Sequence, residues 1–159
     1  MSLSEKLHSN LELTSFPGQI PVNYLYTYGI AGEEFFRTIK DRGKFLASKC
    51  EKCGVIYFPS RIFCERCLNH IPSTFEVPGT GEVFSFTECH ENIDGSRKEK
   101  PVIMAAVKMD ATDCVFIHFL DEVKSEEVFI GMKVEAVLKP KKDREGSIFD
   151  ILHFKPSGK

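Results

Sequence analysis

Four cysteines in two C-x-x-C pairs carry the most specific chemistry in this chain of 159 residues. Cys50 and Cys53 form the first pair, Cys64 and Cys67 form the second, and ten residues separate the pairs. Two such turns facing each other place four sulfurs around one tetrahedral Zn²⁺, at Zn–S distances of about 2.3 Å. Because four thiolates close the coordination sphere, we expect a structural zinc ribbon and not a catalytic metal site.

Other uses of these cysteines are disfavoured or left open. An iron site of rubredoxin type would use the same four sulfurs, and the sequence leaves that alternative open. Disulfides are disfavoured because residues 1–10 lack the apolar core of a signal peptide. A redox C-x-x-C motif would stand singly in a βαβ context, which the sequence does not show. Zn²⁺ is therefore the expected ion.

The composition is that of a soluble globular protein, with 42% hydrophobic residues, 28% charged residues and a formal net charge of −2. No apolar stretch approaches the roughly 18 residues that a membrane helix needs, so we expect no membrane association and a cytoplasmic location. Positive charge gathers around the cysteines, where residues 40–66 hold seven lysines and arginines against three acidic residues. Two further basic runs, 96–100 and 139–144, are expected to be solvated loops.

The N-terminal third is predicted to be partly helical. Residues 1–14 carry four leucines and predict either one or two turns of amphipathic helix or no fixed structure. Residues 15–30 contain prolines and alternating tyrosines and are expected to form an extended aromatic arm. Residues 32–43 begin and end with glycine and carry an apolar stripe, which predicts a helix of about three turns.

Short apolar runs from residue 44 onward predict strands. The runs at 44–50 and 55–64 lead into the two cysteine pairs and are expected to form the scaffold of the ribbon. Five more runs, separated by turn residues, occupy 82–91, 101–110, 114–120, 132–140 and 147–154. Because closure removes exposed sheet edges, a five-stranded OB-type barrel is favoured, with an SH3-like barrel as the alternative.

The sequence thus predicts a mainly β protein with an N-terminal helical segment, a zinc ribbon and a five-stranded OB-fold barrel. We expect an N-terminal arm and helix at 1–43, the ribbon at 44–74 and the barrel at 75–159. No nucleophile elbow, phosphate-binding glycine loop or H-E-x-x-H motif occurs, so the chain is expected not to be an enzyme.

Two further cysteines and two histidines fall within the predicted barrel strands. Cys89 and Cys114 are expected to be buried small apolar residues. His90 and His118 are expected to be hydrogen-bonded strand residues without a catalytic role. Cys89 and His90 are neighbours in one strand and so point to opposite faces, which prevents them from acting as a nucleophile and base pair.

Several segments resemble the family of zinc-ribbon plus OB-fold proteins associated with acyl-CoA, long of unknown function. They include 35–67, with Pro59 and Arg61 before the second cysteine pair, and 75–87, with its Gly-x-Gly step. The resemblance implies a rubredoxin-like ribbon followed by an OB barrel. It also implies an accessory role beside a thiolase and/or a hydroxymethylglutaryl-CoA synthase-like enzyme, because members of the family bridge these two enzymes. Acyl-CoA is the candidate ligand that the resemblance implies.

Eight residues are candidates for contacts with acyl-CoA or with a partner. Cations near the ribbon would bind the phosphates of CoA, and aromatic side chains would line a groove for its pantetheine arm. These residues are Tyr24, Tyr26, Phe35, Phe36, Lys44, Lys49, Arg61 and Arg66. The simpler interpretation is that the cations balance the thiolates and the aromatics pack in the core. The alternative function is single-stranded nucleic-acid binding, which the acidic barrel sequence disfavours.

Overall fold

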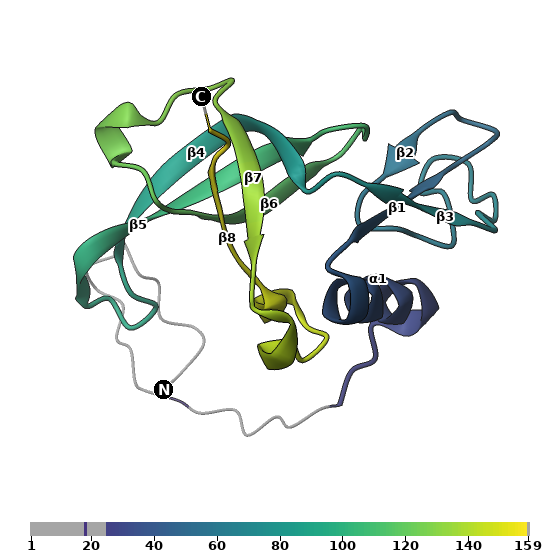
Figure 1. The fold of residues 1–159 in the computed structure, drawn as a ribbon, viewed down its shortest axis with the longest axis horizontal. Coiled ribbons are helices and arrows are strands. Elements are labelled where there is room, and N and C mark those ends of the chain that lie inside the picture. Colours follow the sequence, from purple (N-terminus) through teal and green to yellow (C-terminus); the bar gives the residue numbers. More distant parts are fainter. Residues whose placement is uncertain (1–17, 19–24, 159) are drawn as a thin grey trace, which may run out of the picture.

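The computed structural model describes Gly18 and residues 25–158. These residues form one α-helix, a three-stranded sheet and a closed barrel, with the helix and small sheet on one side and the barrel on the other (Figure 1). No helix in the described residues is long and apolar enough to cross a membrane. The leucines of 1–14 and the candidate Tyr24 lie outside the described residues.

Helix α1 spans Gly29–Arg42 and begins three residues before the predicted start. It ends as predicted because Gly43 adopts a left-handed conformation, with φ of 66°, and donates its N–H to the carbonyl oxygen of Ile39 at 2.9 Å. The helix buries Phe35, which is 1% exposed and packs edge-on against Phe58 at 5.6 Å between ring centres. The predicted role of Phe35 as a ligand or partner contact is therefore wrong, because its ring lies in the core.

The first sheet holds the ribbon. Its strands are β1 (Phe45–Lys49), β2 (Ile56–Tyr57) and β3 (Thr74–Val77), which pair antiparallel in the order β2-β1-β3. Leu46 and Ala47 of the central strand are fully buried, which anchors the sheet on the core. Strand β3 belongs to this sheet, although the predicted boundary at residue 74 assigns most of it to the barrel.

The second sheet is the predicted five-stranded OB barrel, which is confirmed. Its strands close in the order β4-β5-β6-β8-β7. Their bounds are β4 (Thr80–Glu91), β5 (Arg97–Met109), β6 (Val115–Leu120), β7 (Lys133–Leu138) and β8 (Ile151–Pro156).

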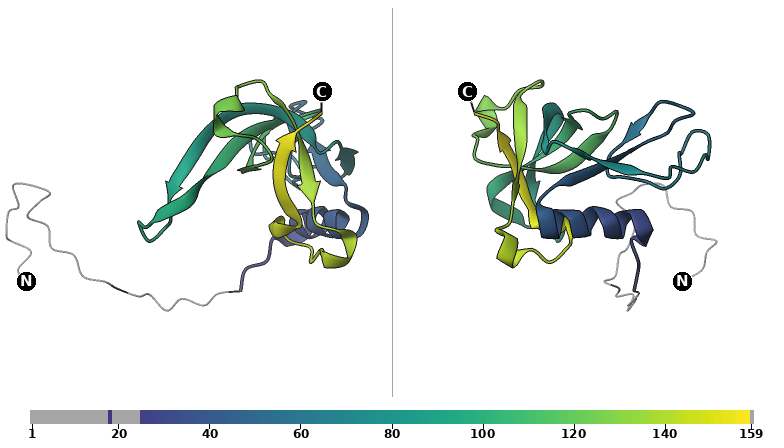
Figure 2. Two further views of the ribbon diagram at one scale, coloured as in Figure 1. Left: turned by 60° about the vertical axis from the view of Figure 1, so that its left-hand side comes forward. Right: turned by 45° about the vertical axis from the view of Figure 1, so that its right-hand side comes forward.

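One of the two predicted basic loops is instead a strand. Residues 97–100 belong to β5, and Arg97 pairs with Glu91 of β4. The β4–β5 hairpin extends beyond the rest of the barrel (Figure 2), so its charged residues stay solvated while the backbone forms a ladder. Residues 139–144 do form a loop, which contains the short 3-10 helix η3 (Lys141–Asp143).

The ribbon is fixed to the barrel by aromatic packing and by a pair of hydrogen bonds. Phe58 of the ribbon packs edge-on against Phe116 of β6, with ring centres 5.3 Å apart. The Ile56 N–H donates to a carboxylate oxygen of Asp113 at 2.8 Å, and the Asp113 N–H donates to the Ile56 carbonyl at 2.9 Å. Because these bonds link β2 to the β5–β6 turn, the position of the ribbon relative to the barrel is set.

Candidate metal centre

The four predicted cysteine ligands lie in one cluster. Their sulfur atoms all lie within 4.8 Å of one another, and the Cys50 and Cys67 sulfurs are 3.7 Å apart. A regular tetrahedron with Zn–S bonds of about 2.3 Å has S–S edges of about 3.8 Å, so the sulfurs fit Zn²⁺. Cys50 and Cys64 are buried, whereas Cys53 is exposed. The predicted structural zinc site is confirmed as a four-cysteine cluster.

The two cysteine pairs make the same turn. The Gly54 N–H donates to the Cys50 carbonyl at 2.7 Å, and the Leu68 N–H donates to the Cys64 carbonyl at 2.9 Å. Both residues after the pairs have a left-handed backbone, with φ of 72° at Gly54 and 58° at Leu68. Glycine adopts this conformation freely, but for leucine it costs about 1–2 kcal/mol. The second turn thus holds a leucine where the first holds glycine.

A buried tyrosine controls the charge of one ligand. The Tyr57 hydroxyl donates to the Cys64 sulfur at 3.2 Å and, with help from backbone N–H groups of Cys67 and Arg66, lowers the pKa of Cys64 to about 6. The same contact raises the pKa of Tyr57 to about 12. Hydrogen bonding to Cys67 raises the pKa of Cys53 to about 12, so Cys64 ionises before Cys53. When bound, Zn²⁺ deprotonates all its cysteine ligands.

The candidate cations do not gather in one pocket. Lys49 and Arg66 are exposed on the ribbon. Arg61 is already engaged, because its guanidinium pairs with Glu65 at 2.6 Å and lies 5.0 Å from the centre of the Tyr57 ring. Lys44 lines a hollow of about 210 Å³ to which none of the other candidates in the described residues contributes.

The candidate aromatics have different environments. Tyr26 is exposed. Phe36 is half-buried, packs edge-on against Tyr28 at 5.2 Å between ring centres, and lines a separate hollow of about 140 Å³. With Phe35 in the core, the structure does not bring the described aromatic and cationic candidates together as one groove for CoA.

Three apolar side chains around the second cysteine pair escaped the sequence prediction. Ile62, Phe63 and Leu68 are 37%, 54% and 79% exposed, and we call them the knuckle patch. A comparison of the two pairs could have found them. Lys49 precedes the first pair and Gly54 follows it, whereas Phe63 and Leu68 take those places around the second.

Two family models match the chain. The model of the ChsH2 rubredoxin-like zinc ribbon domain matches residues 37–72, and that of the ChsH2 C-terminal OB-fold domain matches residues 75–139. A DUF35 domain-containing scaffold protein of Methanocaldococcus jannaschii is 31% identical over 124 residues, which cover 76% of this chain and 87% of that protein. A protein of the same description from Methanothermobacter thermautotrophicus is 27% identical over 76% of this chain and 92% of that protein.

Solved structures agree with this assignment. A crystal structure of a DUF35 family protein of unknown function from Sulfolobus solfataricus has a TM-score of 0.62 at 26% identity, covering 81% of this chain and 87% of that one. The Ltp2–ChsH2(DUF35) aldolase has a TM-score of 0.57 at 22% identity, covering 77% of this chain and 91% of that one, and shows the shared fold. The ribbon, the barrel and these relatives establish that the chain belongs to the DUF35 family.

Proposed function

We propose that the chain is a non-catalytic scaffold whose ribbon docks on an enzyme of acyl-CoA metabolism. The knuckle patch is the observation that carries this proposal. Its three side chains lie exposed beside a four-cysteine site that leaves no open position for a substrate. The three side chains flank one cysteine pair along the chain, and clustered exposed apolar groups are typical of a protein–protein contact.

The backbone at Leu68 supports the same interpretation. Its left-handed conformation disfavours leucine, and its side chain is 79% exposed, so the residue gains little from packing within the chain. Burial against a partner would supply that missing gain. Exposed Lys49, Lys52 and Arg66 stand near the cysteines in the sequence and add positive charge that would steer an acidic partner surface.

The partner is inferred from the relatives and from the resemblance. Two relatives are described as scaffold proteins, and one structural neighbour is part of an aldolase complex. We infer a thiolase and/or a hydroxymethylglutaryl-CoA synthase-like enzyme as the partner. Acyl-CoA would then be held mainly by that enzyme, with Lys44, Lys49, Arg66 and Tyr26 as candidate contacts from this chain.

The rival functions find little support. Cys89 is half-buried, while His90 is exposed and lies 3.4 Å from Glu88, so they do not form a catalytic pair. We therefore expect no condensation or cleavage of acyl-CoA by the isolated chain. A single-strand-binding barrel would need a positive face, and the acid-rich barrel sequence does not provide one.

Recovery of the chain from its native cell tests the proposal. We expect a tagged, zinc-loaded chain to retain a thiolase or synthase, and Leu68→Ser combined with Phe63→Ser to lose it. Ile130→Ser is the matched control, because Ile130 is 69% exposed but lies outside the knuckle patch. Recovery of RNA or DNA instead of an enzyme would contradict the proposal, as would equal retention by the double variant.

A further inference from the structure

The outward face of β6 is apolar where a solvated strand normally carries polar side chains. Leu120 is buried, and the half-buried rings of Phe116 and His118 pack near Phe154 of β8. The alternate residues Val115, Ile117 and Phe119 are 41%, 66% and 46% exposed. An antiparallel sheet with one solvated face usually alternates apolar and polar residues. This face of β6 therefore has the apolar composition typical of a strand face that packs against other protein.

One edge of β6 is almost unpaired. Strand β6 pairs with β5 along its whole length, but its described register with β8 consists of the single pair Leu120 and Phe154. The His118 ring lies 6.2 Å from the Phe154 ring. Among the described residues, the buried Nδ1 of His118 has no hydrogen-bond partner. A strand edge of this kind can accept another strand.

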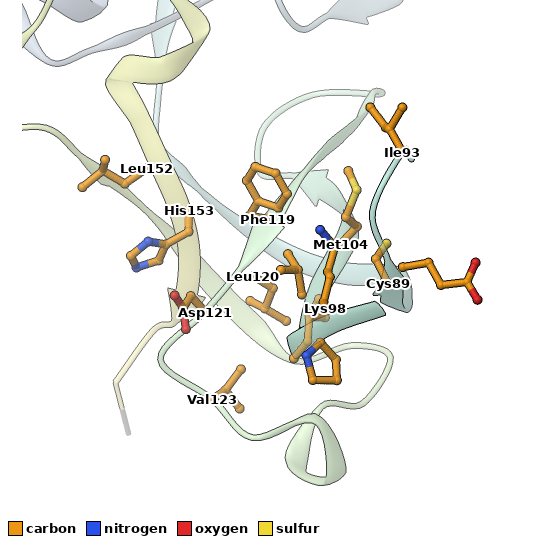
Figure 3. Close-up of a pocket in the computed structure, with 14 residues that line it drawn as sticks. Cys89, Ile93, Lys98, Met104, Phe119, Leu120, Asp121, Val123, Leu152 and His153 are labelled. Carbon is orange, nitrogen blue, oxygen red and sulfur yellow. The ribbon is translucent and has the colours of Figure 1, made fainter. Parts of the chain in front are cut away.

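A groove of about 650 Å³ adjoins this edge (Figure 3). Leu152 and His153 of β8 lie at one side, Phe119 of β6 lies in the middle, and Met104 of β5 and Ile93 of the hairpin lie at the other. These side chains make the lining mainly apolar. The charged residues that line it are Glu91, Lys98 and Asp121. Two carboxylates against one ammonium give the groove a net negative charge. The Lys98 ammonium donates to the Asn92 side chain at 2.5 Å.

We propose that this groove and the open edge of β6 bind an extended segment of a partner protein, apolar at alternate positions and basic at its ends. An added strand would use the backbone groups of the edge and set its apolar residues against Ile117 and Phe119. Its basic ends would complement Glu91 and Asp121. The site lies on the barrel, so it goes beyond the docking proposed for the knuckle patch and does not depend on it.

Other occupants fit less well. A helix satisfies its own backbone groups and would leave the edge of β6 unused. A nucleic acid would be repelled by Glu91 and Asp121. A second copy bound through a twofold axis would present the same carboxylates to each other across the contact. An extended segment of different sequence meets none of these objections.

A designed peptide tests the site directly. The probe is a fluorescein-labelled nine-residue peptide in which valine and threonine alternate between two terminal lysines. We expect saturable binding to the full zinc-loaded chain by fluorescence anisotropy, weakened about tenfold or more by Ile117→Thr and by Phe119→Thr. Threonine suits a strand, so both variants should fold, as circular dichroism would verify. Ile130→Thr, outside the groove, should bind as the wild type does.

Two control peptides and one hydrodynamic measurement decide the alternatives. A peptide of the same composition with its valines in one block, and one with glutamate at both ends, should each bind at least about tenfold more weakly. Equal binding of either control peptide would overturn the proposal, and so would unchanged binding by Ile117→Thr. Sedimentation that shows a dimer abolished by Ile117→Thr would assign the groove to a second copy and overturn it as well.

Discussion

Replacement of Leu68 by glycine tests whether this residue serves the turn after the second cysteine pair or the docking surface. The side chain is 79% exposed and the backbone φ is 58°, so the leucine contributes little packing and carries a conformational cost. Glycine removes the apolar group and at the same time relieves that cost. Leu68→Ala is the matched variant, since alanine also loses the apolar group but keeps the unfavourable backbone conformation.

The magnitudes follow from these two quantities. Glycine removes the cost of the left-handed conformation, which stabilises the fold by about 1–2 kcal/mol. Glycine also has more freedom in the unfolded chain, which destabilises the fold by about 0.5–1 kcal/mol. Leu68→Gly should therefore stay within about 1 kcal/mol of the wild type and exceed Leu68→Ala in stability. Burial of a leucine is worth about 1.5–3 kcal/mol, and four fifths of it is exposed here, so loss of docking should raise Kd about 10- to 50-fold.

The assay pairs two measurements on the same samples. Urea unfolding at fixed excess zinc gives the free energy of unfolding, and isothermal titration with the enzyme recovered from the cell gives Kd. Both variants should bind that enzyme more weakly. Leu68→Ala should keep about the stability of the wild type, and Leu68→Gly should be at least as stable. If Leu68→Gly lost more than about 2 kcal/mol of stability, Leu68 would be a packing residue. If it bound the enzyme with unchanged Kd, the knuckle patch would not be the docking surface.

Three further substitutions test hydrogen bonds within the molecule. Tyr57→Phe removes the donor to Cys64 and should weaken zinc binding about 10- to 100-fold in chelator competition. The loss should be larger at pH 6.5 than at pH 8. In the wild type the Cys64 thiol is already largely ionised at pH 6.5, whereas in the variant zinc must displace its proton. Asp150→Asn should cost about 1–3 kcal/mol at pH 7. Burial opposes ionisation of Asp150, but three backbone N–H donors lower its pKa, so this difference should persist above about pH 4 and vanish as the pH falls through the lowered value. Asp113→Ala should speed hydrogen exchange at the Ile56 amide while the barrel amides stay protected.

Local rules were enough to predict much of the architecture. The C-x-x-C spacing specifies the four ligands because two intervening residues force a turn that brings both sulfurs to one side. Gly43 ends α1 as predicted, since few other residues adopt the left-handed conformation there without cost. The five apolar runs correspond to the five barrel strands, because turn residues separate the runs along the chain.

Tertiary packing decided what the sequence pattern left open. Phe35 is buried against Phe58, whereas the adjacent Phe36 is half-buried. The sequence pattern alone does not show which of the two faces the core. Residues 97–100 form a strand because pairing with β4 overrides the low strand propensity of charged residues. The knuckle patch depends on which side chains remain uncovered after folding, and no local rule provides that information.

Partner retention with and without the metal tests most directly whether the zinc-built ribbon is the docking surface. The zinc-loaded wild type and Cys64→Ser would be compared by co-purification from the native cell, with zinc content and the circular dichroism of the barrel measured on each. The account predicts that Cys64→Ser loses both zinc and the enzyme while the barrel signal remains. A metal-free variant that keeps the enzyme in full would contradict it.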